Sequence, residues 1–234
     1  MAPPDRDAPH PAALLDVDGT LVDTTFHHAV AWWRACRDAG IELPVWRLHR
    51  LIGKGSDQLL ESILGPEEAE ARHEELTSRW EQHWEVVRGE VRALPGAPQL
   101  VRALADGGLR VVCATSGREE DVDAMQDLIG AGASVHAVVN ASEVVQSKPA
   151  PDIFRLALER AGSAASHAVV VGDTVWDAEA AAACGVPSIG VRSGGVSDAE
   201  LRGAGVLAVY DDAADLLANL AASPLGPLLP SRRT

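Results

Sequence analysis

An apolar run, Ala12-Ala13-Leu14-Leu15, leads directly into Asp16-Val17-Asp18-Gly19-Thr20. A short apolar run before a turn residue is typical of a buried strand, after which Gly19 lets the backbone turn sharply. Open α/β sheets bind ligands beyond the carboxyl ends of their strands, where Asp16 and Asp18 are expected to lie. Two carboxylates this close repel unless a cation lies between them or one is protonated. From this stretch alone, a solvated turn explains the pair as well as a functional site does.

Short apolar segments alternate with helical patterns in the second half of the chain. Such alternation indicates βαβ units and a parallel sheet. We therefore predict an α/β fold with a Rossmann-like parallel sheet that carries helices on both faces. The expected strands are residues 109–114, 135–139, 167–171, 187–191 and 207–210, and the expected helices are 99–105, 121–129, 152–161, 177–184 and 213–221.

The region between the first strand and the rest of the sheet has a different pattern. Residues 24–93 show only helical periodicity and hold five of the six tryptophans, most of which we expect in the core. We therefore predict a core domain of residues 11–23 and 94–222, with an all-helical subdomain, residues 24–93, inserted after the first strand. Residues 1–10 and 223–234 are expected to be flexible tails.

The acidic composition limits the partners of this chain. A formal net charge of −14 argues against nucleic acid and against a membrane surface, which both bind basic faces. An anionic substrate stays compatible, because a bound divalent metal reverses the local sign of the charge. Cys36, Cys113 and Cys184 lack metal-ligand spacing, and we recognise neither a secretory signal nor a membrane-spanning run. These features favour a cytoplasmic protein with reduced thiols.

Polar residues follow other predicted strands as well as the first. Thr115-Ser116 follows one strand, Gly172-Asp173 follows another, and Lys148 lies in the loop after a third. The carboxyl ends of parallel strands share one edge of a sheet, so these groups can converge with the Asp16–Asp18 pair. Taken singly, Lys148 is explained equally well as a solvated loop charge, and Asp173 and Asp177 as charges that favour a helix N-terminus.

Together the converging groups suit metal and phosphate chemistry. Carboxylate oxygens are the hard ligands that Mg²⁺ prefers, whereas hydroxyl, backbone N–H and ammonium groups can hold a phosphate. One carboxylate can then attack phosphorus in line. The candidates are Asp16, Asp173 and Asp177 for the metal, and Thr115, the backbone N–H of Ser116 and Lys148 for the phosphate.

Four motifs occur in an order that resembles a known family. Asp16-Val17-Asp18-Gly19-Thr20, Thr115, Lys148 and Gly172-Asp173-x-x-x-Asp177 are similar, in this order, to the four motifs of the haloacid-dehalogenase superfamily. Each motif alone is weak, but four in sequence are specific together. The resemblance covers about Leu14 to Val191. The helical insertion resembles the helical cap of the branch that holds phosphoglycolate phosphatases and β-phosphoglucomutases.

The resemblance implies a role for each motif residue. Asp16 would be the nucleophile that forms an aspartyl-phosphate, and Asp18 would protonate the leaving alcohol and then activate water. Thr115 and Lys148 would hold the phosphoryl oxygens and offset charge in the transition state. Mg²⁺ would be held by Asp16, the backbone carbonyl of Asp18 and Asp173, with Asp177 helping directly or through water.

His28 and Lys54 in the helical insertion are candidate substrate contacts. Lys54 lies in the loop Ile52-Gly53-Lys54-Gly55-Ser56, and we favour a substrate-contacting cation over the Schiff-base lysine of phosphonate-cleaving superfamily members. A solvated lysine explains Lys54 equally well, as a helix-surface residue explains His28.

Three functions are compatible with this pattern. Since dehalogenating members lack an aspartate at the position of Asp18, we expect a Mg²⁺-dependent phosphatase, monomeric or homodimeric, for a small phosphorylated metabolite. A β-phosphoglucomutase-like sugar phosphomutase is the alternative, because Asp23-Thr24-x-x-x-His28-x-x-x-Trp32 and Ser147-Lys148-Pro149-Ala150-Pro151-Asp152 resemble those enzymes. Gly172-Asp173, however, resembles the phosphatases. A phospho-acceptor receiver-type signalling module is a further alternative, which the motif order disfavours.

Overall fold

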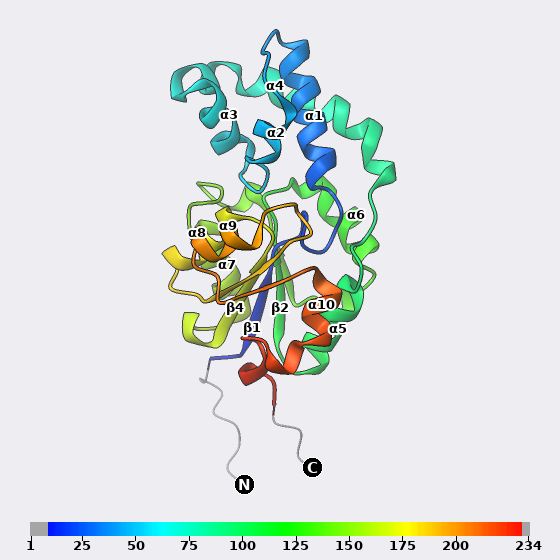
Figure 1. The fold of residues 1–234 in the computed structure, drawn as a ribbon, viewed down its shortest axis with the longest axis vertical. Coiled ribbons are helices and arrows are strands. Elements are labelled where there is room, and N and C mark those ends of the chain that lie inside the picture. Colours follow the sequence, from blue (N-terminus) through cyan, green and yellow to red (C-terminus); the bar gives the residue numbers. More distant parts are fainter. Residues whose placement is uncertain (1–8, 231–234) are drawn as a thin grey trace.

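A parallel six-stranded sheet forms the centre of the fold, with the strand order β3-β2-β1-β4-β5-β6 (Figure 1). The computed structural model describes residues 9–230. All four residues of β1 are buried, and β1 pairs with β2 and β4. The predicted α/β fold with a Rossmann-like sheet is thus confirmed. The strands are β1 (Ala12–Leu15), β2 (Arg110–Ala114), β3 (Ala137–Val139), β4 (Ala168–Gly172), β5 (Ser188–Val191) and β6 (Ala208–Tyr210).

The strands that flank β1 end at the same level as β1. Leu15 lies opposite Cys113 in β2 and opposite Val171 in β4. The residues that follow these three positions therefore share one edge of the sheet. The strand order also reverses at β1, and open α/β sheets bind their ligands at such a reversal.

Alternate residues of the strands are buried against opposite faces of the sheet. Ala13 and Leu15 belong to an apolar cluster that includes residues of α5 and α10, whereas Ala12 and Leu14 belong to a second cluster with residues of α7 and α8. Figure 1 shows these two pairs of helices on opposite sides of the strands. The α-helices after residue 93 are α5 (Ala97–Asp106), α6 (Glu119–Ile129), α7 (Asp152–Ala161), α8 (Val175–Ala183), α9 (Asp198–Gly203) and α10 (Ala213–Ala218).

Four further helices form a block beyond the carboxyl ends of the strands (Figure 1). Two backbone segments lie side by side where this helical block joins the sheet, since Asp23 N donates to Arg92 O and Leu94 N to Leu21 O, both at 2.9 Å. None of the helices in residues 9–230 is long and apolar enough to cross a membrane. The block consists of α1 (Thr25–Asp38), α2 (Val45–His49), α3 (Ser56–Leu64) and α4 (Pro66–Val87).

The C-terminal segment differs from the prediction. We expected a tail from residue 223, but Ser223 and Leu225 are buried, and Leu228 and Leu229 pack against the cluster that contains α5. The prolines and glycine of this segment indicated a loose chain, whereas burial of its leucines holds it on the fold. The remaining parts of the two expected tails, residues 1–8 and 231–234, lie outside the described residues.

Replacing Leu225 by alanine tests this packing. The side chain is fully buried, so we expect Leu225→Ala to lower the free energy of unfolding by about 2–4 kcal/mol. The control Leu207→Ala changes a side chain that is 60% exposed, and we expect a change below about 0.5 kcal/mol. Urea unfolding followed by tryptophan fluorescence measures both values. Equal effects would show that the segment after residue 222 contributes no packing.

Candidate active site

A fully buried ammonium group lies at the edge of the sheet where β1 ends. Lys148 Nζ is 2.5 Å from Asp16 Oδ1 and 2.8 Å from Asp177 Oδ1, and it donates to Ala114 O at 3.1 Å. Lys148 comes from the loop after β3, whereas Asp16 follows β1 and Asp177 begins α8. The solvated-loop interpretation of Lys148 is therefore wrong. The pairing with two carboxylates offsets the free-energy cost of removing its ammonium group from water.

Three buried carboxylates crowd around this one ammonium group. Asp16, Asp173 and Asp177 each offer an oxygen within 4.8 Å of the others. Burial, together with the negative charges of Asp177 and Asp18, raises the pKa of Asp16 to about 7 although Lys148 opposes the shift. Burial and the negative charges of Asp16 and Asp177 raise the pKa of Asp173 well above its usual range. Asp173 makes no ion pair among the described residues, so this site has an excess of negative charge that a divalent cation would offset.

The donor set fits a hard cation such as Mg²⁺. Among residues 9–230, Asp173 accepts hydrogen bonds only from Thr20 Oγ1 and Thr25 Oγ1, each at a long 3.4 Å, which leaves its oxygens available to a metal. Asp177 Oδ2 instead accepts from the N–H and the hydroxyl of Thr174 in a capping box at the start of α8. Asp177 is thus both a helix-terminal charge and a partner of Lys148.

Two glycines leave room for Asp173. A Cβ atom at Gly19, whose φ is +80°, would lie 2.3 Å from Asp173 Oδ2, and one at Gly194 would lie 1.6 Å from the same atom. Gly19 was identified from the sequence, but Gly194, in the loop after β5, was not. Nothing in its sequence neighbourhood distinguishes it from the other glycines of the chain.

The carboxylate of Asp18 is held by three donors. Its Oδ1 contacts Thr24 Oγ1 at 2.7 Å and His28 Nε2 at 3.1 Å, and its Oδ2 accepts from Thr115 Oγ1 at 2.7 Å. Burial opposes ionisation of Asp18, but the contacts with His28, Thr24 and Thr115 outweigh it and lower its pKa to about 2. Binding of a metal through the backbone carbonyl of Asp18 stays a prediction.

The helical block therefore reaches into the site. The Thr24 side chain precedes α1 but makes no capping hydrogen bond and contacts Asp18 instead. His28 is buried and stacks on Trp84 with ring centroids 4.1 Å apart, so its interpretation as a helix-surface residue is wrong. His28 lies beside Asp18, which makes it a contact of the site.

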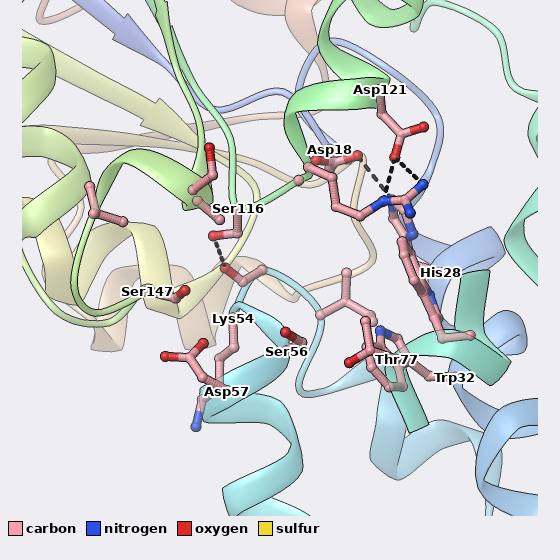
Figure 2. A pocket seen from close by; sticks show the side chains of 18 of the residues that line it. Asp18, His28, Trp32, Lys54, Ser56, Asp57, Thr77, Ser116, Asp121 and Ser147 are labelled. Carbon is pink, nitrogen blue, oxygen red and sulfur yellow. Dashed lines mark hydrogen bonds and ion pairs between the residues drawn. The ribbon is translucent and has the colours of Figure 1, made fainter. Parts of the chain in front are cut away.

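Ser116 and Lys54, the other two candidate residues, contact groups outside the carboxylate cluster. Ser116 Oγ donates to Gly53 O at 3.1 Å and so joins the loop of β2 to the helical block. Lys54 Nζ donates to Ser62 Oγ at 2.9 Å and lies 4.1 Å from the ring centroid of Trp176. Figure 2 shows this ammonium group directed away from Asp18 and Ser116.

A cavity of about 350 Å³ separates the sheet edge from the helical block (Figure 2). This volume is near the lower end of the range of roughly 300–1,000 Å³ found for small-molecule sites. One side carries the acidic and hydroxyl groups of the strand ends, and the other carries side chains of α1, α3 and α4. The residues that line the cavity include Asp18, His28, Trp32, Lys54, Thr77, Trp80, Ser116, Arg118 and Asp121.

Three comparisons relate this fold and site to known proteins. Residues 10–185 match the model of a family described as haloacid dehalogenase-like hydrolase. The chain is 28% identical to a plasmid phosphoglycolate phosphatase of Cupriavidus necator over 94% of this chain and 96% of that protein. It is 32% identical to a hydrolase from Pseudomonas syringae of known crystal structure, with a TM-score of 0.85 over 91% of this chain and 98% of that one. A β-phosphoglucomutase from Clostridium difficile shares the fold at 18% identity, with a TM-score of 0.74 over 87% and 92% of the two chains.

Because the carboxylates crowd one another, Asp173→Asn tests the cation site both without metal and with Mg²⁺. Because the folded pKa of Asp16 is raised, the metal-free protein should lose stability as pH rises from about 4 to about 7, and Asp173→Asn should relieve part of that loss. At about pH 8 we expect the variant to be about 1–2 kcal/mol more stable than the wild type without metal.

The same thermal unfolding series is repeated with Mg²⁺. Millimolar Mg²⁺ should raise the Tm of the wild type and leave that of Asp173→Asn nearly unchanged. Glu159→Gln, which removes an exposed carboxylate on α7, is the control and should behave as the wild type. A destabilised metal-free Asp173→Asn, or a variant that Mg²⁺ stabilises as strongly as the wild type, would contradict the site.

Proposed function

The chain belongs to the haloacid dehalogenase-like hydrolase family, and on this basis we propose that it is a Mg²⁺-dependent phosphatase that acts on a small phosphomonoester through an aspartyl-phosphate at Asp16. One observation carries the proposal. A single ammonium group, that of Lys148, lies among three buried carboxylates at the carboxyl ends of the strands, which suits a divalent cation and a phosphate together. The relative from Cupriavidus necator, named a phosphoglycolate phosphatase, supports the same reaction class.

The residues divide the chemistry between two half-reactions. Asp16 attacks phosphorus, the phosphorus–oxygen bond of the ester breaks, and the leaving oxygen takes a proton from Asp18. Asp18 then takes a proton from water, whose oxygen attacks the aspartyl-phosphate and releases phosphate and the Asp16 carboxylate. Mg²⁺ held by Asp16 and Asp173, with Asp177 beside them, would offset the charge of the carboxylates and of the phosphate.

Lys148 and Thr115 would hold the phosphoryl group. Lys148 Nζ already contacts Asp16, so it lies where charge develops on the transferred group. Thr115 Oγ1 contacts Asp18 and accepts from Gly117 N at 2.8 Å, which fixes its position beside Asp18. Ser116 would add its backbone N–H.

The surroundings of Asp18 prepare it for both steps. With its three donors in place Asp18 is ionised, as a base that takes a proton from water must be. Each donor that it loses raises its pKa, so a leaving oxygen that displaces Thr24 or His28 favours the protonated form that the first step needs. The helical block thereby couples substrate binding to the protonation of Asp18.

Family membership disfavours a receiver-type module, but the mutase stays the second candidate. The stretch that resembles the mutases supplies Thr24 and His28, which both contact Asp18. We also propose that residues 24–93 act as a cap domain over a core of residues 11–23 and 94–222, because the helical block covers the strand ends from which Asp16 extends. The cytoplasmic location and the monomeric or homodimeric state stay predictions.

Asp16→Asn tests the proposed nucleophile. An amide cannot form the acyl-phosphate, so we expect hydrolysis of phenyl phosphate with Mg²⁺ to fall by at least about 10³-fold. The circular dichroism spectrum should stay that of the wild type. Asp23→Asn, an exposed carboxylate in the same stretch, is the control and should keep its activity. Near-normal turnover in Asp16→Asn would refute the proposed nucleophile.

A further inference from the structure

We propose that the part of the cavity formed by the helical block binds an uncharged polyhydroxy alcohol, so that the substrate is a phosphomonoester of a polyol or sugar without a second anionic group. The proposal rests on the proposed function and names its substrate class. Two observations carry it, namely a pair of polar atoms without partners and the positions of the two cations, of which Arg118 is ion-paired and Lys54 lies against Trp176 and Ser62.

The polar atoms belong to α4. Thr77 Oγ1 and Trp80 Nε1 are both buried and have no hydrogen-bond partner among residues 9–230, although both side chains line the cavity. Trp80 itself is 93% buried, since only 7% of it is exposed. The two residues are three positions apart and so share one face of the helix. Figure 2 shows Thr77 beside Trp32 and across the cavity from Asp18.

These two atoms define the kind of group that would satisfy them. An indole N–H can only donate, and a threonine hydroxyl can donate and accept. A neutral hydroxyl both donates and accepts, so it can pair with either atom. Buried polar groups are almost always hydrogen-bonded, so a hydroxylated ligand supplies what the protein does not.

The cationic side chains of the cavity do not favour a second anion. Arg118 contacts Asp121 Oδ2 at 3.1 and 3.2 Å and Glu81 Oε1 at 2.9 Å, and its guanidinium lies 5.2 Å from the ring centroid of Trp80. Lys54 is turned onto Trp176 and Ser62. A carboxylate or second phosphate in this part of the cavity would therefore lose water, and it would gain a cation only if Arg118 or Lys54 left these contacts.

The walls suit a small polyol. The rings of Trp32 and Trp80 stack with centroids 5.4 Å apart, and the rings of His28 and Trp80 stack at 5.6 Å. Ile52 and Met125 add to the apolar lining. Ring faces and aliphatic side chains pack against the C–H groups of a carbon chain, while Thr77 and Trp80 meet its hydroxyls.

The proposal also separates the two candidate reactions. A sugar phosphomutase must accommodate a substrate that carries a phosphate away from Asp16. Arg118 is paired with Asp121 and Glu81, and Lys54, which makes no ion pair among the described residues, lies against Trp176 and Ser62. Holding that phosphate would require one of these two cations to leave its present contacts. The cavity therefore favours the phosphatase.

Matched substrates that differ in a terminal group test the proposal. We would measure kcat/KM with Mg²⁺ for glycerol 3-phosphate against 3-phosphoglycerate and for sorbitol 6-phosphate against 6-phosphogluconate, with phenyl phosphate as the hydroxyl-free reference. We expect the polyol of each pair to be preferred by about tenfold or more. β-Glucose 1-phosphate should give free phosphate, and formation of glucose 6-phosphate would overturn the proposal.

These substrates distinguish a wrong substrate class from a wrong proposed function. If the enzyme hydrolyses phenyl phosphate, and its kcat/KM for the carboxylate-bearing substrates equals that for the polyol phosphates, the substrate class is wrong and the proposed function stands. If no phosphomonoester is hydrolysed, the proposed function itself fails, and this inference with it.

Variants of α4 separate hydroxyl recognition from packing. Thr77→Val keeps the shape of the side chain, and we expect it to lower kcat/KM for the polyol phosphates relative to phenyl phosphate by about 5–10-fold. Thr77→Ser, which keeps the hydroxyl, should retain the wild-type ratio of kcat/KM for polyol phosphates to that for phenyl phosphate. Trp80→Phe should lower this ratio as Thr77→Val does. Ser78→Ala, at an exposed neighbouring position, should leave it unchanged. An unchanged ratio in both Thr77→Val and Trp80→Phe would overturn the proposal.

Discussion

The buried ion pair of Lys148 with Asp16 and Asp177 is the interaction on which the site depends. Taking one charged group out of water costs several kcal/mol unless a partner offsets it, so neither Lys148 nor the two carboxylates would be stable there alone. The pairing joins the loop after β3 to the end of β1 and to the start of α8. Because Asp173 makes the negative charge exceed the positive charge, the same arrangement that fixes Lys148 also favours a divalent cation.

This arrangement requires that the strands end at one level. β1 is buried on both faces, and its register against β2 and β4 places Asp16 beside Ala114 and Gly172, which are the last residues of those strands. The helical block follows at once in the chain, so the first turn of α1 can supply Thr24 and His28 to Asp18. One short stretch of sequence thus positions the proposed nucleophile, the proposed proton carrier and the groups that control that carrier.

Much of this could be predicted because it depends on local sequence. Apolar runs before Asp16, Thr115 and Asp173 predict strand ends, and parallel strands bring their ends together. Contacts between distant segments could not be predicted. Helical periodicity placed Trp80 in the core but did not show that its N–H lacks a partner, and it could not choose between solvent and Asp18 for His28. The packing of Leu225 depends on the apolar cluster with α5 and α10 that it joins, which its own proline-rich neighbourhood does not reveal.

The central claim is that Asp16 becomes covalently phosphorylated during turnover. The direct measurement is a rapid acid quench of enzyme mixed with Mg²⁺ and a slowly hydrolysed phosphomonoester, followed by peptide mapping by mass spectrometry. The account predicts one phosphoryl group on the peptide that contains Asp16, located on Asp16 itself, which appears and decays at rates that match turnover. Release of phosphate during turnover with no phosphorylated Asp16, or a phosphoryl group on another residue, would contradict it.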